Sequence, residues 1–302
     1  MATSFRDELR NTFRSGDTLN ILLLLNVGVF LVIRIIDAVL GLFMVSYFGS
    51  ETLVSYLAVP ASPDNLLWKP WTLITYQFLH YDFLHILFNL LWLFWMGKIF
   101  VEYLGMKKLL SVYILGGIAG AILFIIAYNL FPLFGSTVSQ AQALGASASV
   151  LAITVAIAVF VPDYTIHLLL IGPVRLKYLA LVTILLDIIS ISGSNAGGHI
   201  AHLGGAIFGF VYASNLKKGI NIAQWFETFA QWLKSLPGKR KMKVVKKARP
   251  LSDEDFLHNK KVTQEKIDDI LEKISRSGYG SLTSEERDML FNFSNTKNSD
   301  VN

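Results

Sequence analysis

Six blocks of apolar residues, several of them about twenty residues long, most constrain what this chain can fold into. A helix of about twenty apolar residues crosses the roughly 30 Å of hydrocarbon in a bilayer. The chain has 302 residues, of which 53% are hydrophobic and 16% are charged, whereas soluble domains carry about 25% charged residues. The sequence therefore predicts an all-α polytopic membrane protein.

The expected spans are long apolar runs separated by more polar connections. They cover residues 19–44, 83–103, 109–131, 144–161, 176–191 and 199–215. The last three are short or rich in small residues, as expected for helices buried inside a bundle. We predict a six-transmembrane-helix bundle over residues 19–215, preceded by a cytosolic N-terminal arm at residues 1–18.

The positive charges of the connections set the orientation, because Lys and Arg concentrate on the cytoplasmic side of membrane proteins. They gather in the N-terminal arm, in alternate connections and after the last span, at Arg6, Arg10, Arg14, Lys98, Lys107, Lys108, Arg175, Lys177 and the run 239–249. Lys69 is the main exception. We therefore expect both termini in the cytoplasm. The net charge of +5 comes mainly from the tail, so it indicates orientation and membrane lipid rather than nucleic acid.

The chain has no cysteine, which excludes disulfides and thiolate metal sites. No cleavable signal peptide is indicated, because the first eighteen residues are too polar for one and no Ala-x-Ala site closes the first apolar block. These features fit a bacterial inner (cytoplasmic) membrane. The connection 46–77 is long and apolar and contains Trp68 and Trp71, so we expect it to lie at the membrane interface or to re-enter the bilayer.

The tail is predicted to have two parts. Residues 216–250 contain an amphipathic helix followed by a polybasic linker, a pattern typical of a helix on an anionic membrane surface. A helix that packs on the bundle is the alternative. Residues 251–302 are expected to form a small cytosolic helical hairpin, with Gly278 and Gly280 ending its first helix and a capping box at Thr283-Ser284-Glu285-Glu286 opening its second.

Polar side chains from three spans gather at one depth. With the orientation above, spans two, four and six enter from the outer face. We expect His85 and Asn89 to share a face of span two, and Ser147 and His202 to lie about one turn into spans four and six. Polar groups inside a membrane carry a free-energy cost, so this convergence indicates a functional site.

The chemistry that suits these groups is acyl transfer. A serine hydroxyl becomes a good nucleophile when a neighbouring base takes its proton. We predict Ser147 as the nucleophile and His202 as the base, with His85, Asn89 and the backbone N–H of Ser147 as donors for the oxyanion. Small residues on spans four and six would let the two helices approach closely.

The motifs that carry this chemistry resemble those of the rhomboid intramembrane serine proteases, over residues 70–215 and in the family's order. They are His85-Ile86-Leu87-Phe88-Asn89, Gly97, Glu102-Tyr103-Leu104-Gly105, Gly145-Ala146-Ser147, Ala201-His202-Leu203-Gly204-Gly205 and Gly209. The resemblance implies a six-helix core, hydrolysis of peptide bonds in single-pass transmembrane protein substrates, and a Ser–His dyad with no acidic third member. It also implies a structural role for Glu102, and neither a cofactor nor a metal.

The sequence departs from the family at two positions. Ala148 follows the serine where the family usually has glycine, and it adds a methyl group at a crowded contact. Trp71 is followed by Thr72 where several members have arginine, so the usual arginine contacts of the first loop are not expected.

Other interpretations are weighed on single residues and on function class. His199 could replace His202 as the base, whereas Asp187 is expected to form a hydrogen bond at the outer end of span five more readily than to complete a triad. No His-Glu-x-x-His run indicates a zinc protease, and no carboxylate pair suggests an aspartyl protease. The main rival is a proteolytically inactive rhomboid-like protein that binds membrane helices. The oligomeric state is not indicated.

Overall fold

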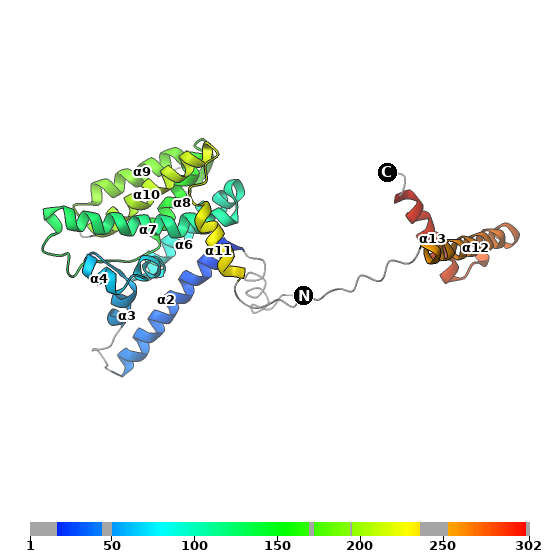
Figure 1. The fold of residues 1–302 in the computed structure, drawn as a ribbon, viewed down its shortest axis with the longest axis horizontal. Coiled ribbons are helices and arrows are strands. Elements are labelled where there is room, and N and C mark those ends of the chain that lie inside the picture. The colour runs from blue at the N-terminus through cyan, green and yellow to red at the C-terminus, as the bar shows by residue number, and fades with distance from the viewer. Residues whose placement is uncertain (1–16, 44–49, 169–171, 194, 236–252, 300–302) are drawn as a thin grey trace. The chain divides into compact units, whose positions relative to one another are not determined.

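The computed structural model describes the chain outside residues 1–16, 44–49, 169–171, 194, 236–252 and 300–302. The chain forms two compact units, Met1–Pro237 and Gly238–Asn302. In both units the described residues are mostly helical, and the described part of the first unit also contains a few very short strands (Figure 1).

Helices occupy all of the predicted spans in the described part of the first unit. They are α2 (Thr18–Leu42), α6 (Phe83–Leu104), α7 (Met106–Leu130), α8 (Ser147–Phe160), α9 (Leu176–Ser190) and α10 (Ala196–Lys217). Among the described residues, α2, α6 and α7 are long and apolar enough to cross a membrane, and α8 is a shorter apolar helix. The chain is therefore an integral membrane protein, while the number of six spans stays a prediction.

The ends of α8 and α10 differ from their predicted positions. Span four was expected from residue 144, but α8 begins at Ser147, because Gly145 has a φ of +128° that no helix accommodates. Gln142–Ala143 just before it forms the strand β2 instead. Span six was expected from residue 199, but α10 begins at Ala196.

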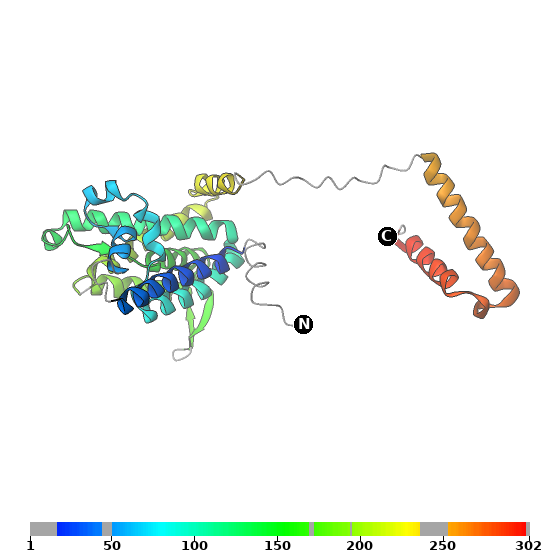
Figure 2. The same ribbon diagram turned by 90° about the horizontal axis from the view of Figure 1, so that it is seen from below.

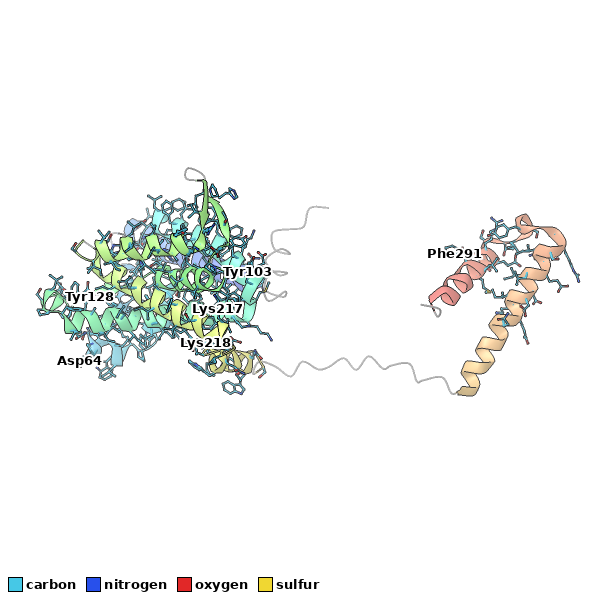
Figure 3. All side chains as sticks on the ribbon, turned by 90° about the horizontal axis from the view of Figure 1, so that it is seen from above. Asp64, Tyr103, Tyr128, Lys217, Lys218 and Phe291 are labelled. Atoms are coloured by element: carbon cyan, nitrogen blue, oxygen red, sulfur yellow. The ribbon has the colours of Figure 1, made fainter. Side chains whose placement is uncertain are left out.

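Helix α8 is the centre of the first unit. Every residue from Ala148 to Ala158 is buried, as expected for a helix that is apolar on all sides and enclosed by others. It packs against α10 and α7, and further against α6 and α9. Tyr103 near the end of α6 and Tyr128 near the end of α7 lie at opposite ends of the unit, so these helices run antiparallel (Figure 3).

Glycines bring α10 into backbone contact with α8, as the small residues predicted. A Cβ atom at Gly205 would overlap the carbonyl oxygen of Ala148, and one at Gly209 would overlap that of Ala152. Only glycine therefore fits at these two positions. Gly120 of α7 leaves room for the methyl group of Ala148, since a Cβ atom at Gly120 would lie 2.7 Å from it.

The connection between α2 and α6 consists of short elements. They are α3 (Ser50–Leu57), β1 (Val59–Pro60), α4 (Pro63–Trp68), α5 (Thr72–Thr75) and the 3₁₀ turn η2 (Tyr76–Phe78). Strand β1 pairs antiparallel with β2, with Val59 opposite Ala143. Trp68 is 82% exposed, and Trp71 donates its indole N–H to the carbonyl of Tyr56 at 2.9 Å. Exposed tryptophan suits the predicted place at the membrane interface.

The other connections are short. The 3₁₀ turn η3 (Pro132–Phe134) follows α7, and β3 (Thr165–Leu168) and β4 (Gly172–Arg175) form a hairpin that projects from the helices (Figure 2). Asp163 beside this hairpin lies 2.7 Å from Lys177 and 3.2 Å from Arg175. The hydrogen bond from Lys177 lowers the pKa of Asp163. In α2, Arg34 pairs with Asp37 one turn further along the helix at 3.2 Å.

Helix α11 (Gln224–Ser235) combines the two interpretations of its sequence. It contacts α7, and Phe226 packs on the hydrophobic core of the first unit. Its other large apolar side chains are exposed, namely Trp225, Phe229, Trp232 and Leu233. One side of the helix thus faces the bundle and another is free to meet a membrane surface.

The second unit contains α12 (Asp253–Ser277), the 3₁₀ turn η4 (Tyr279–Ser281) and α13 (Ser284–Ser299) (Figures 1 and 3). Gly278, with a φ of +76°, follows the end of α12 as predicted. The predicted capping box is confirmed: the backbone N–H of Thr283 donates to Glu286 at 2.7 Å, and that of Glu286 donates to the Thr283 hydroxyl at 3.3 Å. Lys273 of α12 pairs with Glu286 at 2.9 Å and lowers the pKa of its carboxyl group.

We predict that Gly209→Val destabilises the first unit, because its side chain would overlap the backbone of α8. Overpacking costs about 1–3 kcal/mol, so the midpoint of thermal unfolding in detergent should fall by roughly 2–10 °C. Gly28→Val in α2 is the matched control, since nothing lies within 4 Å of a Cβ atom there. Equal midpoints for the two variants would contradict the close contact of α8 with α10.

Candidate functional site

The predicted site residues line one cavity of about 530 Å³ in the first unit. His85 and Asn89 reach it from α6, Ser147 from α8 and His202 from α10. Asp187 of α9 lines it as well. The structure therefore brings together the residues that the sequence placed at a common depth, and it adds a carboxylate to them.

The turn that precedes α8 holds Ser147 at the N-terminus of the helix. It is the first residue of the helix, rather than one turn inside it as expected. The backbone N–H of Gly145 donates to the carbonyl of Tyr76 at 2.9 Å, and the pairing of β1 with β2 fixes the strand just before it. The N–H groups of the first helical turn have no acceptor within α8, so they present donors and a partial positive charge beside the serine.

His85 lies beside Ser147 across Gly145. A Cβ atom at Gly145 would lie 3.0 Å from Nε2 of His85 and 3.5 Å from Oγ of Ser147, so only glycine leaves the space between them open. The Asp82 side chain caps α6 by accepting the backbone N–H of His85 at 2.7 Å. Asn89 donates one side-chain N–H to the carbonyl of His85 at 2.9 Å, which leaves its second N–H for another acceptor.

His202 lies nearly two turns into α10, deeper than the one turn expected, because this helix begins at Ala196. Its Nδ1 atom lies 2.8 Å from Oδ1 of Asp187, and Nδ1 of His199 lies at the same distance from the same oxygen. The expected hydrogen bond of Asp187 is thus present, with two partners. Among the described residues that line the cavity, His202 is included and His199 is not, which favours His202 as the residue that faces Ser147.

Asp187, His199 and His202 are also the described residues that could hold a metal ion, with ligand atoms within 4.8 Å of one another. Ligands of a tetrahedral zinc ion with bonds of about 2.0 Å lie about 3.3 Å apart. The two nitrogen–oxygen separations of 2.8 Å are shorter than this and match hydrogen bonds.

The sequence analysis missed Tyr76 and Gln77. These residues anchor the connection between α2 and α6, called the first loop here, next to the site. The Gln77 side chain is fully buried, donates to the carbonyl of Leu73 at 2.9 Å and accepts the hydroxyl of Ser149 at 3.0 Å. Tyr76 donates its hydroxyl to the carbonyl of Gly117 in α7. Buried polar groups retain such partners because unmade hydrogen bonds are costly. Ser149 and Gly117 are distant in sequence from this loop, so no local pattern indicates these two contacts.

His80 is buried next to His85, with ring centroids 5.0 Å apart. Neither of its ring nitrogens has a hydrogen-bond partner among the described residues. Burial, followed by the nearby His85, lowers the pKa of His80 to about 4. The folded protein therefore holds this imidazole neutral at pH 7, as part of the packing around the site.

Comparisons with known proteins give two family matches. The Rhomboid domain matches residues 67–218, which is half of the chain. A second family, described as a family of unknown function (DUF6576), matches residues 252–296.

Individual relatives are similar over part of their length. RHOMBOID-like protein 12, mitochondrial, of Arabidopsis thaliana is 31% identical over 158 residues, which cover 49% of this chain and 47% of that protein. Rhomboid protease GlpG of Salmonella choleraesuis is 36% identical over 80 residues, covering 26% of this chain and 29% of that protein. The Salmonella newport protein of the same name is 33% identical over 86 residues, 28% and 31% of the two chains. Each match spans less than half of the relative.

We predict that His80 makes the folded state sensitive to acid. The unfolded chain binds a proton at His80 near the ordinary pKa of 6.5, whereas the folded chain does so only near 4. The free energy of unfolding therefore has its full value above pH 6.5. It falls by on the order of 3 kcal/mol as the pH drops to 4. His80→Phe should flatten the loss of thermal midpoint over this range, while His167→Phe, at an exposed histidine of β3, should not. An unchanged pH dependence in His80→Phe would contradict the prediction.

Proposed function

This chain belongs to the rhomboid family, and from this premise we propose that it is an intramembrane serine endopeptidase. It cleaves transmembrane segments of other membrane proteins, with Ser147 as nucleophile and His202 as general base. The observation that supports this most is the common cavity, which Ser147, His202, His85 and Asn89 line from three separate helices. A packing serine has no need of such neighbours.

The first half of the reaction forms an acyl-enzyme. Oγ of Ser147 attacks the carbonyl carbon of the scissile peptide while Nε2 of His202 takes its proton. The negative charge that develops on the carbonyl oxygen is stabilised by donors fixed in advance, namely the ring N–H of His85, the second side-chain N–H of Asn89 and the backbone N–H of Ser147. His202 then gives the proton to the leaving amine as the C–N bond breaks.

The second half releases the new carboxyl end. Water enters the cavity and loses a proton to His202 as its oxygen attacks the acyl carbon, and the proton returns to Oγ of Ser147 as the ester bond breaks. The substrate helix has to unwind locally first, because a helical peptide bond is hydrogen-bonded and shielded. Segments with small or helix-destabilising residues near the outer membrane face are therefore the expected substrate class.

The chain's own charges support the proposed orientation in the membrane. We assign the protein to a bacterial inner membrane with both termini in the cytoplasm. The support is that Asp163, Arg175 and Lys177 gather at the end of α8 opposite to Ser147. Positive charge at this end of α8 favours a position on the cytoplasmic side of the membrane. The other end of α8, with the cavity, would then face the outer side.

Ala148 gives little support to the alternative that the protein is inactive and only binds membrane helices. The added methyl group, which could have impaired packing, lies against Gly120 of α7, where the missing side chain leaves room. Ala148 is thereby buried without displacing Ser147 from the cavity. The departure from the usual glycine is matched by a glycine on the neighbouring helix.

We predict that Ser147→Ala abolishes cleavage of a model transmembrane substrate by the purified full chain in proteoliposomes. His202→Ala should lower the rate by roughly 10²–10⁴-fold. Ser214→Ala, elsewhere on α10, is the control and should cut normally. A fluorophosphonate probe should label the wild type and Ser214→Ala but not Ser147→Ala.

Two outcomes would overturn this proposal in different ways. Equal cutting by the wild type and Ser147→Ala would mean that another group is the nucleophile. A folded wild type that neither cuts substrates nor reacts with the probe would favour the inactive binding protein.

A further inference from the structure

Asp187 is an inward-facing carboxylate on a helix that is otherwise largely exposed. It is 8% exposed, while its neighbours Leu186 and Ile188 are 57% and 50% exposed. A charged group at membrane depth is costly unless it is paired, so such residues mark functional sites. Among the described residues, the side chains that bond to Asp187 are two imidazoles of α10, those of His199 and His202. The buried position of this carboxylate is therefore explained by its partners on α10 and not by a partner on its own helix.

The contact of His202 with Asp187 determines which ring nitrogen of His202 carries the proton. An ionised carboxylate can only accept hydrogen bonds, so Nδ1 of His202 must donate to Oδ1 of Asp187 across their 2.8 Å separation. A neutral imidazole carries one ring proton, and with that proton on Nδ1 its Nε2 atom is left as an acceptor. Nε2 is the atom that a general base facing Ser147 needs.

We propose that Asp187 is a positioning residue that holds His202 in this tautomer and orientation, and that stabilises the imidazolium formed when Ser147 is deprotonated. The inference rests on the proposed function and deepens it. It gives the site an acidic third member, which the Ser–His dyad implied by the family resemblance lacks.

His199 supports Asp187 from the side away from the cavity. Its Nδ1 atom donates to the same oxygen at 2.8 Å, and its ring meets that of His202 edge to face, with centroids 5.8 Å apart. This second hydrogen bond restrains the carboxylate between the two rings. The other titratable side chains that line the cavity, Asp82 and His85, come from the start of α6 and have no recorded bond to Asp187.

The test compares cleavage of one transmembrane substrate by wild type and by variants of the full chain in proteoliposomes. Asp187→Asn keeps the size of the side chain but removes the charge, and its amide favours the wrong ring tautomer. We expect kcat to fall about 100-fold or more while KM changes less than about threefold. Asp187→Glu, which restores the carboxylate, should recover at least a tenth of the lost rate.

Two further measurements separate positioning from a merely structural role. The fluorophosphonate probe should label Asp187→Asn more slowly than the wild type but to the same final extent, because the pocket and Ser147 remain in place. Asp163→Asn, at the exposed acid beyond the other end of α8, is the matched control and should keep wild-type kcat. His199→Ala should retain more than a tenth of kcat.

The experiment gives a different result for each way in which the proposal can fail. If the wild type cuts and Asp187→Asn retains kcat within about threefold, the positioning role is wrong and the Ser–His proposal stands. If Asp187→Asn lowers the final extent of labelling as much as the rate, Asp187 is structural and the inference fails. A loss in His199→Ala equal to that in His202→Ala would overturn the assignment of His202 as the residue that Asp187 positions. A wild type that neither cuts nor reacts fails at the proposed function itself.

Discussion

The backbone contact between α8 and α10 is the constraint on which the site depends. Gly205 and Gly209 present no side chain to the carbonyl groups of Ala148 and Ala152, so the two helices lie as close as their main chains allow. In a bilayer, where apolar side chains gain little by leaving lipid, such close van der Waals packing is a main source of helix association. Ser147 and His202 are short-reaching groups on different helices, and this contact is what lets both line one small cavity.

A second layer of contacts orients the serine within that frame. The first loop reaches the turn before α8 through the carbonyl of Tyr76, and the buried amide of Gln77 ties the same loop to Ser149. Gly145 is the joint of this turn, since its left-handed backbone and missing side chain leave room for His85 beside Ser147. The loop therefore belongs to the framework of the candidate site, although its own side chains contribute none of the proposed chemistry.

The sequence predicted the helices and their convergence well, because both rest on local patterns. Apolar runs located the helices, glycine spacing predicted the contact of α8 with α10, and Thr283 with Glu286 predicted the cap of α13. It failed where partners are remote or backbone geometry is special. No periodicity pairs Gln77 with Ser149, and nothing local to Asp187 reveals that two imidazoles on another helix will share it. The chemical roles of Ser147 and His202 stay predictions.

The position of α10 after α8 in the chain has a consequence for biosynthesis. During translation, α8 with its serine is synthesised before α10. On the proposed function, the nascent chain then carries a nucleophile without its base, and the backbone of Ala148 and Ala152 has not yet met Gly205 and Gly209. Activity begins only when the last of these helices docks, so a truncated or stalled translation product is inert toward its neighbours in the membrane.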